Sequence, residues 1–350
     1  MALHTVIMAG GKGERLWPIS TPDNPKQMLA FEGTSSLLEK TFERSRRFSE
    51  PETIYVVTGD ALREKVHRQL PEMPEENILS EPFGRNTAPC IGYAAVVISK
   101  KDPSGTMVVL PSDHIITSED TFSDVITAGA SALMTYPDLL ITIGIVPESP
   151  ETGYGYIAPG GAIETGGEIH LRHVVKFHEK PPKERAQEYV REGFLWNGGM
   201  FLWKVDTILK MFARYMPEMY EHLMLLKDSP SSSHDAVHQF YESVPSLSID
   251  YGIMEKADRI AVIPVRFGWN DVGSWDALGR ILPADDEGNA ARGEHLFVDS
   301  SRNITYSSGK EIVLIDVHDL AVIEGDETIL VCPRTSSQRV SEIVRKIHGK

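Results

Sequence analysis

The sequence predicts an α/β protein with a doubly wound, mixed but mostly parallel sheet, followed by a small C-terminal β-domain and a closing helix. Two observations carry this prediction. Short apolar runs alternate with amphipathic segments over the first two-thirds of the chain, and only short, evenly spaced apolar runs follow a polar linker at residues 283–293. Alternating strands and helices imply βαβ units with parallel pairing, whereas short strands split by turn residues are typical of a β-domain.

Strands and helices alternate regularly between residues 5 and 144. The expected strands are Thr5–Ala9, Ile54–Thr58, Thr106–Leu110 and Leu139–Gly144. The expected helices are Leu37–Arg47, Ala61–Leu70, Thr87–Lys100 and Thr121–Tyr136. In doubly wound sheets ligands bind outside the carboxyl ends of the strands. The loops 10–27 and 111–114 follow the ends of two predicted strands and are therefore the first places to look for a site.

The pattern loosens from residue 151 onward. Further strands are expected at Tyr154–Ile157, Glu168–His178, Gly199–Lys204 and Ile260–Val265, and further helices at Val205–Leu226 and Ser274–Leu282. The polar linker then suggests two domains, a catalytic domain at 1–282 and a small β-domain with a closing helix at 283–350.

The C-terminal segment has a sequence pattern typical of a β-helix or a similar small β-domain. Short strands are expected at Leu296–Val298, Ile312–Val317, Leu320–Ile323 and Thr328–Val331. Apolar residues then recur with the spacing of an amphipathic helix, at Val340, Ile343, Val344 and Ile347. A β-unit this short leaves open strand edges that need cover, so we expect a homodimer.

Composition excludes several classes of partner. The chain has 50 acidic and 35 basic residues, a formal charge of −15, so its surface is a poor binder of nucleic acid or anionic membrane. The first nine residues lack the features of a signal peptide, and no apolar stretch approaches the ~20 residues of a membrane span. The two cysteines form no redox or metal motif. We therefore expect a cytoplasmic protein that binds neither nucleic acid nor membrane.

A glycine-rich, basic loop follows the first predicted strand. Its three glycines and two cations are Gly10, Gly11, Gly13, Arg15 and Lys26. Such glycines turn backbone N–H groups onto an anion, and an arginine binds phosphate oxygens bidentately. The spacing fits neither the dinucleotide fingerprint, since Leu16 stands where a third glycine is needed, nor a Walker A loop. Alone, this loop predicts only that phosphate is bound.

Ordered blocks of sequence then narrow the prediction. They are Gly10-Gly11-x-Gly13-x-Arg15-Leu16-Trp17-Pro18, Pro25-Lys26-Gln27, Glu81-Pro82-x-x-Arg85-Asn86-Thr87-Ala88-Pro89, Pro111-Ser112-Asp113-His114, Glu151-Thr152-Gly153-Tyr154-Gly155-Tyr156-Ile157, Phe177-x-Glu179-Lys180-Pro181, Trp196-Asn197-Gly198-Gly199-Met200-Phe201, Ser248-Ile249-Asp250-Tyr251 and Trp269-Asn270-Asp271-Val272-Gly273-Ser274-Trp275. In this order the blocks resemble those of the mannose-1-phosphate guanylyltransferases, members of the sugar nucleotidyltransferase superfamily. Gly198, where the family would have Ser, is a small departure.

The resemblance implies a Rossmann-like nucleotidyltransferase fold and an enzyme that transfers GMP from GTP to α-D-mannose 1-phosphate. The products would be GDP-mannose and pyrophosphate. A sugar phosphate is largely a dianion at pH 7, so its oxygen could attack the α-phosphorus in line without a general base. Catalysis would then consist of holding the anions together and neutralising the charge of the leaving group.

The resemblance also assigns roles to residues of this chain. The catalytic residues would be Arg15 and Lys26, which balance phosphate charge, with Asp113 and Asp271, which jointly bind Mg²⁺. This hard cation takes one or two carboxylates together with phosphate oxygens and waters. Other nucleotide contacts are expected from Gly10, Gly11, Gly13, Asn86, Thr87 and Ser112. Contacts to the sugar phosphate are expected from Gly153, Tyr154, Glu179, Lys180, Asn197 and Asp250.

Competing hypotheses stay open at this point. The same chemistry could act on another sugar 1-phosphate or another nucleoside triphosphate. A non-catalytic homologue could instead bind sugar nucleotide and regulate a partner, although Arg15, Lys26, Asp113 and Asp271 are all present. A bifunctional chain with a phosphomannose isomerase is disfavoured, because the segment after the linker is short and contains no cluster of metal-binding histidines.

Overall fold

The computed structural model describes residues 2–11, 13–31, 33–229 and 233–348. Two compact units are formed, each from separate stretches of chain. Unit 1 comprises Met1–Gly10, Thr41–Ser112 and Ile116–Trp269, and unit 2 comprises Gly11–Lys40, Asp113–Ile115 and Asn270–Lys350. The glycine-rich loop from Gly11 onward and the C-terminal segment therefore belong to the same unit. The predicted division by segment, at residues 282 and 283, stays a prediction.

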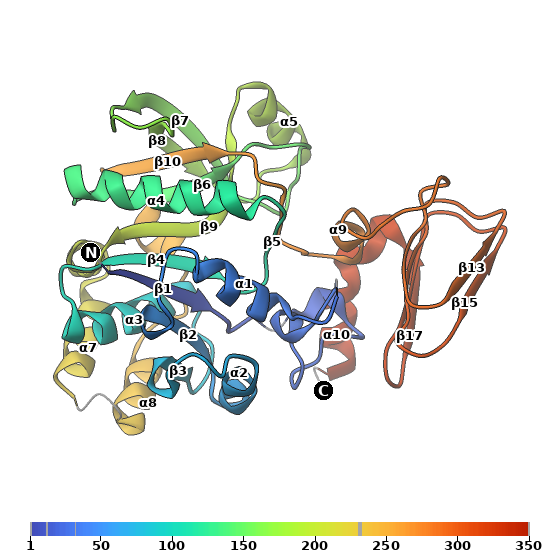
Figure 1. Cartoon of the computed structure of the whole chain (residues 1–350), viewed down its shortest axis with the longest axis horizontal. Helices are drawn as coiled ribbons and strands as arrows, with labels where there is room; N and C mark the ends of the chain where they lie inside the picture. Colours follow the sequence, from blue (N-terminus) through green and yellow to red (C-terminus); the bar gives the residue numbers. More distant parts are fainter. Residues whose placement is uncertain (1, 12, 32, 230–232, 349–350) are drawn as a thin grey trace. The chain divides into compact units, whose positions relative to one another are not determined.

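Unit 1 is built on a nine-stranded sheet with the order β3-β2-β1-β4-β9-β6-β10-β8-β7 (Figure 1). The strands are β1 (Leu3–Met8), β2 (Ile54–Gly59), β3 (Ile78–Glu81), β4 (Thr106–Pro111), β6 (Leu140–Ile145), β7 (Tyr156–Ile163), β8 (Leu171–His178), β9 (Leu195–Lys204) and β10 (Ile260–Val265). Parallel pairs join β1 to β2 and β4, β2 to β3, and β6 to β10. Because β8 and β9 pair antiparallel with their neighbours, the predicted mixed, mostly parallel sheet is confirmed.

Helices cover both faces of this sheet. They are α2 (Arg63–Gln69), α3 (Thr87–Lys101), α4 (Glu119–Thr135), α5 (Lys183–Arg191), α6 (Val205–Tyr215), α7 (Pro217–Asp228) and α8 (His234–Ser243). Successive side chains of a strand point to opposite faces. Met107 and Val109 of β4 accordingly share a core with α3, α6 and α7, whereas Val108 and Leu110 share another with α4. A doubly wound sheet with two hydrophobic layers results.

Shorter elements complete unit 1 or contain a point where the chain passes between the units. Single turns of helix occur at η3 (Pro51–Thr53), η4 (Asp60–Leu62), η5 (Glu75–Asn77) and η6 (Asp250–Met254). Three of these passages occur in α1 (Leu37–Ser45), β5 (Ile115–Ile116) and β11 (Trp269–Asn270). Within the described part of the chain, none of the helices has the length and apolar character needed to span a bilayer.

Unit 2 contains a small stack of short strands. These are β12 (Ala290–Arg292), β13 (His295–Val298), β14 (Ile304–Tyr306), β15 (Ile312–Ile315), β16 (Leu320–Glu324) and β17 (Ile329–Pro333). One sheet has the order β12-β14-β16-β17 and the other pairs β13 with β15. The pairs β12–β14, β14–β16 and β13–β15 are parallel and follow successive turns of chain, which is the arrangement of a β-helix.

Helical segments supply the rest of unit 2. They are η1 (Glu14–Leu16), η2 (Lys26–Met28), α9 (Trp275–Gly279), η7 (Arg334–Arg339) and α10 (Val340–His348). The predicted closing helix is confirmed, but only Val340 and Val344 of its apolar stripe are buried, whereas Ile343 is 43% and Ile347 49% exposed. One half of the stripe therefore packs inside unit 2 and the other half faces solvent.

Candidate active site

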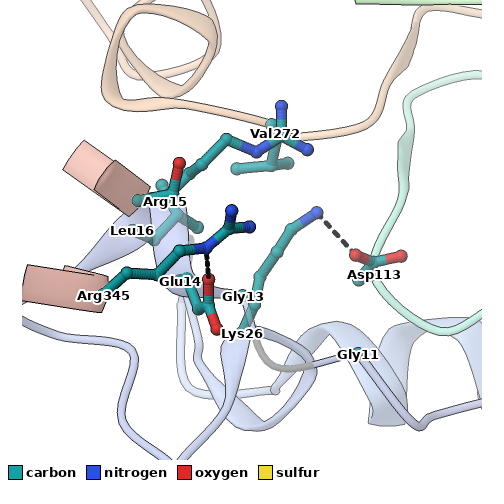
Figure 2. Close-up of a pocket in the computed structure, with 11 residues that line it drawn as sticks. Gly11, Gly13, Glu14, Arg15, Leu16, Lys26, Asp113, Val272 and Arg345 are labelled. Atoms are coloured by element: carbon teal, nitrogen blue, oxygen red, sulfur yellow. Dashed lines mark hydrogen bonds and ion pairs between the residues drawn. The ribbon is translucent and has the colours of Figure 1, made fainter. Parts of the chain in front are cut away.

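A cavity of about 350 Å³ lies within unit 2 (Figure 2). This volume is at the lower end of the range for small-molecule sites. The lining comes from the glycine-rich loop, the segment after β4, the segment before α9, and α10. It consists of Gly11, Gly13, Glu14, Arg15, Leu16, Lys26, Asp113, Val272, Gly273, Ser341 and Arg345. Residues predicted to handle phosphate are thus gathered around one space.

Lys26 is the buried cation of this cavity and is only 6% exposed. Its Nζ donates a hydrogen bond to Oδ2 of Asp113 at 2.7 Å and another to the backbone carbonyl of Asp271. Burial raises the pKa of the Asp113 carboxyl. The charges of Lys26 and His114 lower this pKa by more than burial raises it, so the net shift is downward. Asp113 is therefore a carboxylate at neutral pH.

Gly13 allows the loop to pass close to this lysine. Its φ of +64° lies in the left-handed region, and a Cβ at this position would stand 2.5 Å from Cβ of Lys26 and 2.7 Å from Oγ of Ser20. Real Cβ atoms do not approach other atoms so closely, and an L side chain disfavours this backbone conformation. A glycine is thus required at residue 13, because any other residue would clash with Lys26.

Arg15 and Asp271 complete the predicted catalytic set, and both belong to unit 2. The exposed Arg15 donates from Nη1 to Oε1 of Gln338 at 3.2 Å. Oδ1 of Asp271 accepts a hydrogen bond from the backbone N–H of Gly273 at 3.0 Å. Among the described residues, no group of three or more His, Cys, Asp or Glu side chains is suited to hold a metal ion.

The residues predicted to hold the sugar phosphate lie together in unit 1. The backbone N–H of Lys180 donates to the carbonyl of Tyr154 at 3.2 Å, and Nζ of Lys180 lies 3.3 Å from Oε1 of Glu179. The Tyr154 ring packs edge-to-face on Trp196 and Trp269 with centroid distances of 5.0 and 5.1 Å. The loop that begins at Gly153 is thereby joined to the Glu-Lys pair.

Asn197 connects this loop to Asp250. Its backbone N–H donates to the carbonyl of Gly155 at 2.8 Å, and its Nδ2 donates to Oδ1 of Asp250 at 2.7 Å. Burial raises the pKa of Asp250, the Asn197 hydrogen bond lowers it, and the charge of Glu179 raises it, for a net upward shift. A Cβ at Gly155 would lie 2.5 Å from Oε2 of Glu179, so this glycine permits the close approach of the carboxylate.

The remaining predicted nucleotide contacts are also in unit 1. Asn86 caps α3, with Oδ1 accepting from the N–H of Thr87 at 2.8 Å, and Oγ1 of Thr87 accepts from the N–H of Ile249 at 2.9 Å. Ser112 directly follows β4 and is 2% exposed, and Gly10 comes shortly after β1. The start of α3 is thus hydrogen-bonded to the segment that contains Asp250, one of the residues predicted to hold the sugar.

Comparison with known proteins agrees with these motifs. Residues 4–287 match the nucleotidyl transferase family, and residues 293–347 match the mannose-phosphate isomerase/GMP-like β-helix domain. The mannose-1-phosphate guanylyltransferase of Klebsiella pneumoniae is 36% identical over 351 residues, which cover 98% of this chain and 73% of that protein. The Escherichia coli K12 enzyme of the same name is 35% identical over 355 residues, covering 99% and 73%. The chain belongs to the mannose-1-phosphate guanylyltransferase family.

A solved structure supports the same assignment. A protein from Thermus thermophilus, described as a mannose-1-phosphate geranyltransferase, has a TM-score of 0.88 and 34% identity over 99% of both chains. The chain is accordingly a nucleotidyltransferase, and the predicted α/β fold with a C-terminal β-helix is confirmed.

Three polar residues that line the cavity of this family member had no predicted role: Glu14, Ser341 and Arg345. Nε of Arg345 lies 3.4 Å from Oε2 of Glu14, a residue 331 positions away in the chain. Only the i, i+4 spacing of Ser341 and Arg345 on the polar side of the predicted closing helix could have drawn attention to them.

Glu81 is a further residue whose chemistry the sequence did not reveal. It ends β3, is 4% exposed, and accepts a hydrogen bond from the Tyr241 hydroxyl at 2.7 Å. Burial raises the pKa of its carboxyl to about 7, although the hydrogen bond from Tyr241 lowers it. A carboxyl group that titrates near neutral pH is thus present in unit 1.

Proposed function

We propose that this protein transfers GMP from GTP to α-D-mannose 1-phosphate and releases GDP-mannose and pyrophosphate. The observation that carries the proposal is the cavity of unit 2, where the glycine-rich loop, Arg15, Lys26 and Asp113 line one space. The choice of base and sugar is supported by the relatives named mannose-1-phosphate guanylyltransferase.

The phosphate groups of GTP would be bound by the cavity of unit 2. Backbone N–H groups of Gly11 and Gly13 would donate to phosphate oxygens, and the guanidinium of Arg15 would bind them bidentately. Lys26 would neutralise charge that builds on the departing pyrophosphate. Such preorganised donors and cations are usually the largest single contribution to catalysis of this type.

Asp113 and Asp271 would hold Mg²⁺. Both residues already direct oxygen atoms at one cation, because the ammonium of Lys26 is bound by the carboxylate of Asp113 and by the main-chain carbonyl of Asp271. Hard oxygen donors with few carboxylates fit this ion, which usually completes its shell with waters and substrate phosphates. When bound, the metal would withdraw charge from the phosphate oxygens.

The sugar phosphate would be bound by unit 1. Its hydroxyl groups would be held by Glu179, Asn197 and Asp250 and by backbone groups of Gly153 and Tyr154, and its phosphate by Lys180. The hydrogen bonds that join these residues support this assignment, because they fix the carboxylates and the amide before the sugar arrives. Nearby, Asn86, Thr87 and Ser112 would contact the nucleotide.

A matrix of the four nucleoside triphosphates against several sugar 1-phosphates, followed by pyrophosphate release, tests this proposal. GTP with mannose 1-phosphate should give the highest kcat/KM. Asp113→Asn and Asp271→Asn should abolish magnesium-dependent turnover, whereas Asp326→Asn, a matched change at an exposed position of unit 2, should not. If pyrophosphate is released fastest with a different pair, that pair replaces GTP and mannose 1-phosphate as the proposed substrates. If no pair gives pyrophosphate, the result favours a regulatory protein that binds sugar nucleotide.

We also propose that the protein forms a homodimer through the β-helix of unit 2. The paired strands β13 and β15 expose Leu296, Val298, Val313 and Ile315, which are 50%, 39%, 46% and 63% exposed. Leu296 lies opposite Val313 and Val298 opposite Ile315, so the four form one apolar face of a kind typical of interfaces. Light scattering should give twice 38.9 kDa, and a monomer mass, or a dimer that Ile315→Glu leaves intact, would contradict this.

A further inference from the structure

The C-terminal helix contributes directly to the cavity of unit 2. Val340 and Val344, one turn apart on α10, are buried in a core that also contains Leu16 of the glycine-rich loop. Ser341 and Arg345 follow these valines by one position each, and therefore lie together on the adjacent side of the helix. Both line the cavity. The apolar side of α10 thus determines where its polar side faces.

Polar contacts connect the same two segments. Arg15 donates to Gln338 at 3.2 Å, and Arg345 lies 3.4 Å from Glu14. Figure 2 shows the Arg345 side chain extending from its helix to Glu14, on the same side of the cavity as Arg15. Two guanidinium groups from distant parts of the sequence are therefore presented at one edge of the cavity.

The charges of the cavity favour an anionic ligand. Among the described lining residues, Arg15, Lys26 and Arg345 are basic, and Glu14 and Asp113 are acidic, so the cavity is net positive in a chain of net charge −15. Lys26 is occupied by Asp113 at 2.7 Å. The guanidinium groups are thus the cations most readily turned toward a ligand.

The pair between Arg345 and Glu14 is weak enough to exchange. The Arg345 side chain is 75% exposed and Glu14 is 31% exposed, and exposed pairs of this kind add little to stability. A phosphate group carries more charge than a carboxylate and matches the planar donors of a guanidinium. A polyphosphate in the cavity would therefore displace Glu14 from Arg345.

We propose that Arg345 is a phosphate-binding residue of this enzyme, which holds the polyphosphate of the nucleotide and the pyrophosphate formed from it. The C-terminal helix is then part of the active site, and Glu14 is the counter-ion that Arg345 leaves when phosphate enters. This inference rests on the proposed guanylyltransferase function, since that reaction brings a polyphosphate to the cavity.

Calorimetric titration of the full-length protein with inorganic pyrophosphate tests the proposal without turnover. Arg345→Gln should weaken pyrophosphate binding about tenfold, whereas Arg345→Lys should recover part of the loss because it retains the charge. Glu14→Gln should tighten binding about two- to threefold, since it removes a negative charge that competes for Arg345. Lys346→Gln removes one charge from the neighbouring position of α10, outside the cavity lining, and should leave binding unchanged.

The sign of the Glu14 effect separates binding from a structural role. If the ion pair only held the helix in place, Arg345→Gln and Glu14→Gln would weaken pyrophosphate binding alike, and that result would overturn the proposal. Unchanged binding in Arg345→Gln would overturn it too. In steady-state kinetics, the Arg345→Gln variant should have a raised KM for GTP and an unchanged KM for mannose 1-phosphate. If the wild type turns over GTP and mannose 1-phosphate and the Arg345→Gln variant has the same kinetic constants, this inference alone is refuted. If pyrophosphate binding depends on Arg345 but the wild type shows no turnover, only the proposed reaction is refuted.

Discussion

Replacing Glu81 by glutamine should flatten the pH dependence of the stability of this protein. The carboxyl group of Glu81 is 4% exposed, and it accepts a hydrogen bond from the hydroxyl of Tyr241 at 2.7 Å. Burial disfavours the charged form, and the pKa rises from 4.5 to about 7. The glutamine of the Glu81→Gln variant would keep an acceptor oxygen for Tyr241 and would not titrate.

The size of the effect follows from the two pKa values. A difference of about 2.5 units, at about 1.36 kcal/mol per unit, corresponds to about 3 kcal/mol. Because the folded protein binds this proton more tightly than the unfolded chain, the contribution of protonated Glu81 is fully present below pH 4.5. It is lost as the pH rises to 7, where the folded group itself ionises. The variant should therefore gain stability relative to the wild type by about 3 kcal/mol, mostly between pH 5 and 7.

Urea unfolding followed by circular dichroism at pH 5, 6, 7 and 8 measures this difference. Glu76→Gln provides a matched control at an exposed position near β3, and its difference from the wild type should not change with pH. Tyr241→Phe should extend the pH dependence to higher pH, because the Tyr241 hydrogen bond lowers the pKa of Glu81. A stability difference between Glu81→Gln and the wild type that is constant from pH 5 to 8 would show that Glu81 is ionised throughout, and the reasoning would fail.

Three further changes test other parts of the structure. Lys26→Ala should lower kcat about 100-fold or more, because it removes the buried cation of the cavity; initial rates within threefold of the wild type would exclude its role. Gly155→Ala should raise the KM for the sugar phosphate roughly tenfold, because its Cβ would displace Glu179; an equal rise in the KM for GTP would contradict this. Asn303→Ala should lower the free energy of unfolding by about 2–4 kcal/mol, since the fully buried amide bonds to Asn289 and to two backbone groups; denaturant melts would contradict this if the loss stayed under about 0.5 kcal/mol.

Apolar periodicity was sufficient to predict the long strands and helices of unit 1. The strand Ile260–Val265 has the predicted bounds, and the helix from Thr87 differs from its predicted end by one residue. The predicted helix Val205–Leu226 is two helices, because Pro217 lacks an N–H and takes the first position of α7. The local apolar pattern thus located the elements. It did not show the break between α6 and α7, which is caused by the single residue Pro217.

Three of the shortest strands gave no usable pattern. The four residues of β3, Ile78–Glu81, and the three residues of β12 and β14 are too few to show a period of two. They form because neighbouring strands supply hydrogen-bond partners, and in β14 because the side chain of Asn303 bonds to the adjacent turns of the β-helix. Such tertiary support has no counterpart in a local sequence window.

The candidate site shows the same limit. The loop residues Gly13, Arg15 and Lys26 could be selected from sequence because a glycine-rich basic loop after a strand has a physical meaning by itself. Asn197 and Asp250 carry no such local signal, and only the resemblance to a family suggested that they act together. Arg345 had no signal of either kind, because its place depends on which side of α10 packs inside unit 2.

Buried apolar surface, rather than charge, positions the C-terminal helix beside the glycine-rich loop. Leu16, Val340 and Val344 are 1%, 4% and 9% exposed and share one core, and full burial of such a side chain contributes about 1.5–3 kcal/mol. The exposed pair between Glu14 and Arg345 contributes about 0–1 kcal/mol. The apolar contacts can therefore hold the helix in place while the guanidinium changes partner. The guanidinium of Arg345 can then bind a ligand, because the fold does not depend on the ion pair between Arg345 and Glu14.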